Sequence, residues 1–323
     1  MNTSLIYGPV EKELAQAELQ LKGLARSGSG SDNLASLLSY TVGTSGKRVR
    51  PALTLLASKF GPIASDRPVT MAVAVELLHI ATLIHDDTVD NSSLRRGQAT
   101  VSNLWGRNVA VLLGDYIFAA SATFVCSTNN VPVIRRFSET IMELSQGELM
   151  EIFGANDSNT SLDTYWQRIY NKTASLFSTA AESGAILNDA SPEVASALRD
   201  YGKNLGLAFQ VIDDILDLQA TQQEVGKPVG NDLLQGVLTL PSLLLLQRYP
   251  EDNPIPKLFQ GIDPQENLAR AITMVQERGL IQESYKTAQE LCQKARAAIA
   301  PLPDLEAKAS LLALTDYVLS RRH

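Results

Sequence analysis

The chain has 323 residues, a formal net charge of −7 and 45% hydrophobic residues. A chain of this length can bury a large core, and its acidity argues against a nucleic-acid surface, which needs a basic stripe. We find no linker rich in Pro, Gly, Ser or charge, so we predict a single domain over residues 1–323.

The expected location follows from three features of the sequence. Residues 1–15 contain no apolar core of signal-peptide length. The most apolar run, residues 69–84, contains polar residues and is shorter than a membrane span requires, so we expect a core helix. Cys126 and Cys292 lack metal-ligand spacing and are expected to be buried free thiols in a reducing cytoplasm. We therefore expect a soluble, cytoplasmic protein without a transmembrane anchor.

Apolar residues recur at helical spacing along nearly the whole chain, and convincing strand alternation is absent. The sequence therefore predicts an all-α fold, a bundle of roughly ten or more helices. Turn signals separate the helical segments at residues 27–31, 61–62, 154–160, 188–192, 226–228 and 250–256.

An acidic triplet, Asp86, Asp87 and Asp90, directly follows the apolar run 69–84. On a helix, positions i, i+1 and i+4 lie within an arc of about 100°, so the three carboxylates share one face. The break at residues 91–93 predicts that the triplet lies at a helix C-terminus, where negative charge opposes the helix dipole. A bound cation would offset both the repulsion and the dipole.

The same spacing recurs in Asp213, Asp214 and Asp217, after the apolar run 205–212. One such triplet could be a solvated acidic face. Two copies among residues that favour burial need another explanation, because buried unpaired carboxylates are costly. Carboxylate oxygens without Cys or paired His suit a hard ion such as Mg²⁺, which completes its coordination with water and substrate phosphates. The duplication predicts a site for Mg²⁺ and a polyphosphate.

Basic residues gather near both triplets, as a polyphosphate site requires. A solvated helix end is the ordinary explanation of any one basic cluster. Four clusters beside two acidic triplets are harder to explain in that way. The clusters are Lys47, Arg48 and Arg50; Arg95 and Arg96; Lys172; and Lys227.

In their order and spacing these motifs resemble the trans-type isoprenyl diphosphate synthase family, in particular its long-chain members. The matching segments are Gly-Lys-Arg-Val-Arg-Pro at 46–51, His-Asp-Asp-Thr-Val-Asp at 85–90, Leu-Arg-Arg-Gly at 94–97, Gly-Asp at 114–115, Lys-Thr at 172–173, Phe-Gln-Val-Ile-Asp-Asp at 209–214 and Gly-Lys-Pro-Val-Gly-Asn-Asp at 226–232. The resemblance implies helices around a central active-site cavity. It also implies the 1′-4 trans condensation of an allylic diphosphate with isopentenyl diphosphate to a polyprenyl diphosphate.

The resemblance further implies a role for each site residue. Three Mg²⁺ ions per site would be bound by Asp86, Asp87, Asp90, Asp213 and Asp217, with Asp214 as close support. The allylic diphosphate would be contacted by Arg95, Lys172 and Lys227. Isopentenyl diphosphate would be bound without the metals by Lys47, Arg50, His79 and Arg96. Thr173 and Gln210 would lie near the reacting carbons.

The chemistry of this reaction suits these residue types. Ionisation of an allylic diphosphate creates a delocalised carbocation and concentrated negative charge on the leaving group. Metal ions and Arg or Lys donors stabilise that charge, and a dry apolar pocket protects the cation. No side chain is an obvious general base, so the departing diphosphate is expected to accept the proton.

Product length depends on residues about one helical turn before Asp86, which are expected to point into the space of the growing tail. Ala81 and Thr82 are small, so the tail can pass to the next turn at Leu78. An isoprene unit is about as long as one helical turn, ~5 Å, and by family analogy we expect a product of about six to eight units. Val237, which replaces a lysine found in several family members, also resembles long-chain synthases.

Assembly is the remaining expectation. The resemblance implies a homodimer, and long apolar helices such as residues 117–125 leave surplus surface to bury. Transient membrane contact during product release stays open.

Several other functions also stay open. A farnesyl or geranylgeranyl diphosphate synthase would make a shorter product. A terpene cyclase would share the ionisation step but has no need of an isopentenyl site around Lys47. A non-catalytic subunit of a heteromeric synthase would not need both triplets intact. A phosphohydrolase around His85 and Asp86 would need further histidines, and a di-iron bundle around Glu76 and His79 would need a second copy of that spacing.

Overall fold

The computed structural model describes residues 3–27, 32–43, 46–95, 97–219 and 229–321. It divides into two compact units of three segments each. Unit 1 comprises residues 1–138, 179–199 and 302–313, and unit 2 comprises residues 139–178, 200–301 and 314–323. The first acidic triplet belongs to unit 1 and the second to unit 2. The single domain over residues 1–323 stays a prediction.

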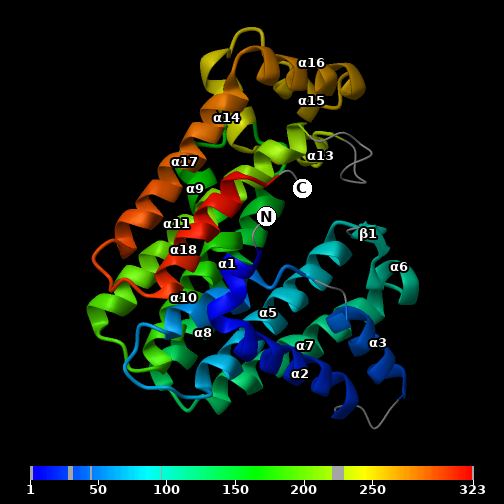
Figure 1. Ribbon diagram of the computed structural model, residues 1–323. Coiled ribbons are helices and arrows are strands. Elements are labelled where there is room, and N and C mark those ends of the chain that lie inside the picture. Colours follow the sequence, from blue (N-terminus) through cyan, green and yellow to red (C-terminus); the bar gives the residue numbers. More distant parts are fainter. Residues whose placement is uncertain (1–2, 28–31, 44–45, 96, 220–228, 322–323) are drawn as a thin grey trace. The chain divides into compact units, whose positions relative to one another are not determined.

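Unit 1 contains the N-terminal helices, which Figure 1 shows in blue to green. They are α1 (Thr3–Tyr7), the 3-10 turn η1 (Gly8–Val10), α2 (Glu11–Ser27), α3 (Asp32–Gly43), α4 (Val49–Ser58), α5 (Arg67–Val89), α6 (Val101–Trp105) and α7 (Arg107–Ser127). A short antiparallel hairpin of β1 (Leu94–Arg95) and β2 (Gln98–Ala99) separates α5 from α6.

Unit 2 contains most of the later elements. They are α9 (Leu162–Ile169), the π-helical segment η2 (Tyr170–Ala174), α13 (Asn231–Leu234), α14 (Leu240–Arg248), α15 (Ile255–Phe259), α16 (Pro264–Glu277) and α17 (Leu280–Ile299). Within the described ranges, the boundary between the units falls inside α8 (Val131–Phe153), α10 (Ser175–Leu187), α11 (Pro192–Gln219) and α18 (Glu306–Leu319).

The helix α5 is buried on all sides within unit 1. It packs against α2, α4 and α7, and Figure 1 shows it beside α7. Residues 71–78 are all buried. A helix that is apolar all round needs a cover on every face, which these neighbours supply. The predicted core helix over residues 69–84 is confirmed, and it extends beyond that run at both ends.

Two helices of the described chain, α5 and α7, could cross a membrane by length and composition alone. In α5, 72% of the apolar window is buried within the protein, as in the core helix of a soluble protein. In α7 the buried share is 33%, and Val111 and Leu112 are exposed. The predicted length of the run 69–84 was too short, because α5 has 23 residues. Burial, and not length, argues against a membrane span there.

Glycines allow α11 to approach the π-helical segment within unit 2. A Cβ added at Gly206 would lie 2.6 Å from Cα of Ala174. A Cβ added at Gly202 would lie 2.5 Å from the carbonyl oxygen of Phe177. Real Cβ atoms do not come so close to other heavy atoms, so this packing requires glycine. It brings Gln210 and the second triplet, later on α11, toward the elements that carry Lys172 and Thr173.

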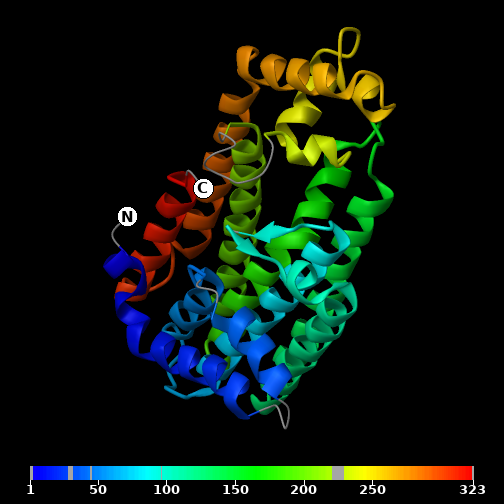
Figure 2. The ribbon, with the colours of Figure 1, turned by 90° about the vertical axis from the view of Figure 1, so that its right-hand side faces the viewer.

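The C-terminal part of unit 2 is also helical. Figure 2 shows α16 turning sharply into α17. Gly279, with φ of 71°, lies at that turn and provides the left-handed conformation that it needs. The helix α14 packs against both α16 and α17.

The all-α prediction is confirmed. Of the two cysteines predicted to be buried free thiols, Cys292 is buried, whereas Cys126 is exposed, so its predicted burial was wrong. Four predicted turns lie at or beside helix boundaries, at residues 61–62, 154–160, 188–192 and 250–256. Residues 226–228, and 28–31 of the first predicted turn, lie outside the described ranges. The hairpin of β1 and β2 was not predicted, because strands of two residues are too short to show alternation.

Candidate active site

The first triplet lies at the C-terminal end of α5, as the sequence predicts. Asp90 caps the helix, and its backbone N–H donates to the carbonyl of Asp86 at 2.8 Å. Asn91, with φ of 51°, then turns the chain away from the helix axis. The triplet therefore occupies the helix end that carries partial negative charge, where a cation binds favourably.

The middle carboxylate of this triplet is held by the hairpin. Asp87 is 7% exposed, and both of its oxygens accept from Nε of Arg95 at 2.8 Å. Arg95 lies on β1, and Gly97, with φ of 76°, allows the chain to reverse into β2. The positive charge of Arg95 offsets the cost of burying this carboxylate.

His85, next to the triplet, packs against a glycine on α7. A Cβ at Gly114 would lie 2.3 Å from Nε2 of His85, so a larger residue would displace the ring. The same nitrogen lies 3.3 Å from the carbonyl oxygen of Val111 and 3.4 Å from Oδ1 of Asp115. The Gly-Asp motif at 114–115 therefore anchors the end of α5 to α7.

Two residues assigned to isopentenyl diphosphate meet in unit 1. Nη1 of Arg50 donates to Nε2 of His79 at 3.2 Å. Lys47 is exposed, and its backbone carbonyl accepts from the hydroxyl of Tyr7 at 2.6 Å.

The middle carboxylate of the second triplet is also buried, but its partners are neutral. Asp214 is 2% exposed, and its Oδ2 accepts from the hydroxyl of Tyr165 at 2.7 Å and from the backbone N–H of Leu240 at 3.2 Å. Its Oδ1 accepts from Nε2 of Gln210 at 3.0 Å. Burial raises the pKa of Asp214, and the hydrogen bonds oppose this only in part.

The outer carboxylates of the second triplet have different partners. Asp217 accepts from the backbone N–H groups of Asn231 at 3.2 Å and Asp232 at 3.3 Å. Oδ1 of Asp213 lies 2.8 Å from Nη2 of Arg321 in an ion pair, and the Arg321 guanidinium stacks 3.8 Å above the ring of Phe209.

Lys172 and Thr173 lie in the π-helical segment η2. The backbone N–H of Ser175 donates to the carbonyl of Tyr170, five residues earlier. Such π turns occur frequently at functional sites. The hydroxyl of Thr173 donates to Oε1 of Gln210 at 2.7 Å, so one chain of hydrogen bonds joins Thr173, Gln210 and Asp214.

Sequence reasoning missed several acidic partners in unit 2. Nζ of Lys172 lies 2.8 Å from Oε2 of Glu148 and contacts Glu151, both on α8. Asp232 is half-buried, and burial followed by repulsion from Asp217 raises its pKa well above the usual value. The spacing of Glu148 and Glu151 on one helix could have indicated these two acidic partners. Nothing in the sequence indicates the hydrogen bond that Tyr165 donates to Asp214, 49 residues later.

The structure brings together some predicted residues and not others. Within unit 1 it joins Asp87 with Arg95 and Arg50 with His79. Arg96 and Lys227 lie outside the described residues. In the described ranges, no group of three or more His, Cys, Asp or Glu side chains forms a ready-made metal site. Each triplet would need substrate phosphates or water to complete the coordination of a hard ion, as Mg²⁺ usually does.

The residues assigned to product length lie in the buried part of α5. Leu78 and Ala81 are fully buried, at 0% exposed. Thr82 is half-buried, and its hydroxyl donates to the carbonyl of His79 at 2.8 Å. Their assignment to product length stays a prediction.

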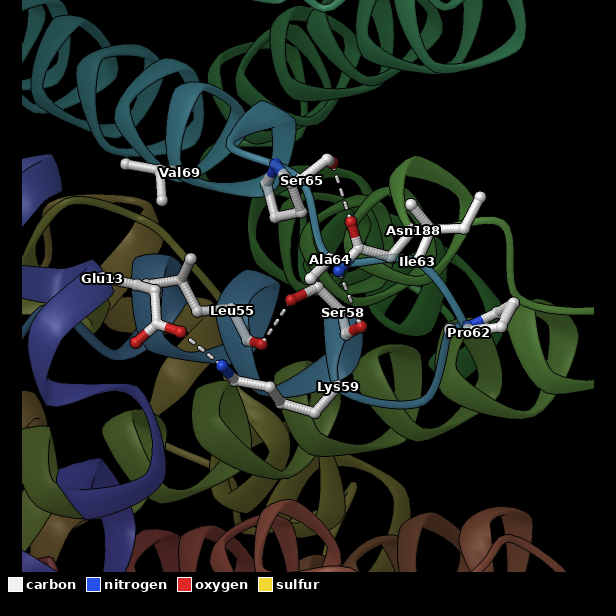
Figure 3. Close-up of a pocket in the computed structure, with 12 residues that line it drawn as sticks. Glu13, Leu55, Ser58, Lys59, Pro62, Ile63, Ala64, Ser65, Val69 and Asn188 are labelled. Atoms are coloured by element: carbon white, nitrogen blue, oxygen red, sulfur yellow. Dashed lines mark hydrogen bonds and ion pairs between the residues drawn. The ribbon is translucent and has the colours of Figure 1, made fainter.

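A small cavity in unit 1 is separate from all of these residues. It has a volume of about 210 Å³ and lies between the end of α4 and the start of α5. Figure 3 shows the ion pair of Glu13 and Lys59 at its edge and the hydrogen bond from Ser65 to Asn188. No predicted site residue lines it, and its volume is below the range of about 300–1,000 Å³ that is typical of ligand pockets.

Three comparisons with known proteins agree with one another. The family model for polyprenyl synthetase matches residues 31–275. A prenyl transferase of Synechocystis sp. is 36% identical over 327 aligned residues, which cover 100% of both chains. Heptaprenyl diphosphate synthase component 2 of Bacillus subtilis is 34% identical over 322 residues, covering 100% of this chain and 92% of the relative.

A solved structure extends the similarity to the fold. The polyprenyl synthase from Caulobacter crescentus, complexed with calcium and isoprenyl diphosphate, has a TM-score of 0.92 at 31% identity. The match covers 100% of this chain and 98% of that one.

Proposed function

The chain belongs to the polyprenyl synthetase family, and we propose that it is a Mg²⁺-dependent prenyltransferase. It condenses an allylic diphosphate with isopentenyl diphosphate in the 1′-4 trans manner. A carbon–carbon bond forms between the two substrates, diphosphate leaves the allylic partner, and one proton is lost. The product is a polyprenyl diphosphate of medium or long chain length.

The observation that carries this proposal is the pair of intact acidic triplets in a chain similar to prenyl transferases over its whole length. A carboxylate of each triplet contacts an arginine, Asp87 with Arg95 and Asp213 with Arg321. Alternating acidic and cationic groups suit a metal–diphosphate complex, in which both signs of charge are present.

Mg²⁺ fits the donor set, which consists of carboxylate oxygens. We assign it to Asp86, Asp87, Asp90, Asp213 and Asp217, with three ions per site by family resemblance. When bound, the ions neutralise the diphosphate and favour its departure. The related structure holds calcium, which also takes oxygen ligands.

The chain's own cations bind the two diphosphates separately. Arg95, Lys172 and Lys227 bind the allylic diphosphate. Lys47, Arg50, His79 and Arg96 bind isopentenyl diphosphate. The contact of Arg50 with His79 supports their common assignment. The chain Thr173–Gln210–Asp214 orients the Thr173 hydroxyl and the Gln210 amide beside the reacting carbons.

The surface and the family support our proposals for assembly and location. We assign a homodimer, because α7 is an apolar helix with a largely uncovered window in the single chain. The B. subtilis relative is named as component 2 of its synthase, so a second kind of subunit is the alternative. We also assign a soluble cytoplasmic protein, with α5 serving as a core helix.

One assay tests the proposed reaction. Purified protein is incubated with one allylic diphosphate, radiolabelled isopentenyl diphosphate and MgCl₂, and the dephosphorylated products are separated by chromatography. Products of about six to eight units are expected by family analogy. A product that stops at three or four units would assign a short-chain synthase. An unlabelled cyclic hydrocarbon would assign a terpene cyclase, and no reaction by the single chain would assign a non-catalytic subunit.

A further inference from the structure

Arg48 has a backbone conformation that is uncommon for its residue type. Its φ of 49° and ψ of 35° lie in the left-handed region, directly before the first residue of α4. A residue with a Cβ is disfavoured there relative to glycine. The conformation must therefore be held by the contacts of the side chain.

The guanidinium of Arg48 uses all three of its nitrogens. Nε contacts Oε1 of Glu18 on α2, and Nη1 lies 2.5 Å from Oε1 of Glu76 on α5. Nη2 donates to the carbonyl of Val42 at the end of α3, at 3.2 Å. The side chain is 13% exposed and that of Glu76 is 6% exposed. Burial lowers the pKa of Arg48, but the two carboxylates more than offset this and raise it.

This buried contact lies beside the residues assigned to isopentenyl diphosphate. Arg48 stands between Lys47 and Arg50 in sequence, and Glu76 lies three residues before His79 on α5. The pairs Arg48–Glu76 and Arg50–His79 therefore form two neighbouring links from the start of α4 to the same face of α5. On the N-terminal side of Arg48, the hydroxyl of Tyr7 donates to the carbonyl of Lys47.

We propose that Arg48 and Glu76 are positioning residues for the isopentenyl diphosphate site, with Tyr7 as a second support. Their contacts hold the segment 47–50 so that the Lys47 ammonium and the Arg50 guanidinium are preorganised for a diphosphate that is bound without metal. This inference rests on the proposed function. Arg48 itself is occupied by Glu18, Glu76 and Val42, so it acts through its neighbours and does not bind the substrate.

Two variants test whether the guanidinium of Arg48 and its carboxylate partner are needed. Arg48→Gly relieves the left-handed conformation but removes the guanidinium, and Glu76→Gln keeps the size of the partner but removes its charge. Each should raise the KM for isopentenyl diphosphate about tenfold or more, because small displacements of positioning groups carry large kinetic costs. The KM for the allylic diphosphate should stay within about twofold, and Arg48→Lys should recover only part of the loss, since it cannot make three fixed contacts.

A matched control exists in the same unit. Lys59, just after α4, contacts Glu13 on α2, as Arg48 before α4 contacts Glu18 on α2. Lys59→Met removes a link between the same two helices, but Lys59 lines the small cavity of Figure 3, to which no residue of the segment 47–50 contributes. It should leave both KM values unchanged.

A milder variant keeps the test decisive if Arg48→Gly and Glu76→Gln do not fold. Tyr7→Phe removes one hydroxyl from the exposed surface and should raise the KM for isopentenyl diphosphate by a few-fold, while kcat at saturation is retained. Thermal unfolding of every variant is measured alongside its kinetics.

The outcomes distinguish this inference from the proposed function. A wild-type chain without prenyltransferase activity would remove the proposed function. An active wild type whose folded Arg48→Gly, Glu76→Gln and Tyr7→Phe variants keep the normal KM for isopentenyl diphosphate would overturn the positioning role. Equal rises in both KM values, or the same rise in Lys59→Met, would also overturn it, because either result indicates a general structural effect.

Discussion

The two acidic triplets share one spacing but lie in different surroundings. The first ends α5, and its middle carboxylate, Asp87, is paired with a charged partner, Arg95. The second lies within α11, and its middle carboxylate, Asp214, accepts from the neutral donors of Tyr165, Gln210 and Leu240. In each triplet the middle carboxylate is buried, at 7% exposed for Asp87 and 2% for Asp214.

Helix geometry explains what the triplets share. Positions i and i+4 differ by about 40° around the axis, whereas i+1 is turned about 100° from i. The outer pair of each triplet therefore points in nearly one direction, and the middle residue points aside. In both triplets the middle residue connects its helix to the surrounding protein, through Arg95 for Asp87 and through Tyr165 for Asp214.

The largest expected effect tests whether the outer residues of both triplets are needed equally. Asp86→Ala and Asp213→Ala should each lower kcat by about 10²–10³ or more, because each removes a preorganised group that stabilises charge in the transition state. Steady-state assays with Mg²⁺ measure this. Near-normal elongation by either variant would contradict the assignment of its triplet to the metals.

The middle residues should differ in their effect on stability. Asp214→Ala leaves buried donors on Tyr165, Gln210 and Leu240 without this acceptor and should cost about 2–4 kcal/mol of unfolding free energy. Asp87→Ala should cost about 1 kcal/mol, because Arg95 can turn to water. Urea unfolding in EDTA compares the two, and an equal cost would show that the surroundings of the triplets do not differ energetically.

The two cationic sets assigned to the two diphosphates should separate kinetically. Lys47→Ala, in unit 1, should raise the KM for isopentenyl diphosphate about tenfold, because one charge-assisted contact is lost. Lys172→Ala, in unit 2, should raise the KM for the allylic diphosphate by a similar factor. Initial rates with each substrate varied in turn provide the measurement. If each variant affected both substrates equally, the division of the diphosphates between the two cationic sets would be wrong.

The smallest effect on rate is expected for a substitution at Ala81, which should leave the first condensation nearly as fast as in the wild type. Ala81→Phe places a ring one turn before the first triplet and should shorten the product by about one or more units, at ~5 Å per helical turn. Chromatography of dephosphorylated products measures the chain length, with Ala110→Phe on α7 as a comparison for general disturbance of the buried core. An unchanged product from Ala81→Phe would remove this residue from length control.

The sequence predicted the elements more fully than the contacts between them. Helical spacing predicted α5, and the break at residues 91–93 placed the first triplet at its C-terminus. Both predictions depend on neighbours in the chain. The bond from Tyr165 to Asp214 joins residues 49 positions apart, and spacing on α11 gives the direction of Asp214 but not its partner. The pairing of Lys172 with Glu148 was missed for the same reason.

The assignment of Asp87 to the metals rests on resemblance and stays a prediction. By resemblance it was grouped with Asp86 and Asp90, whereas Asp214 was placed as support for Asp213 and Asp217. The structure gives Asp87 and Asp214 the same buried position within their triplets. A motif records residue types and order, and the burial of each carboxylate depends on elements such as the hairpin that the sequence did not predict.

The π-helical segment has a consequence for insertions and deletions in this region. Its bond from Ser175 to Tyr170 spans five residues, so α9 and α10 are joined by a turn that is one residue wider than an α-helical turn. Removing one residue, such as Asn171, would let the helix run on without a break. All of α9 would then rotate by about 100° relative to α10. Tyr165 would turn away from Asp214 although no residue of the triplets had changed, so the length of this segment is as constrained as its composition.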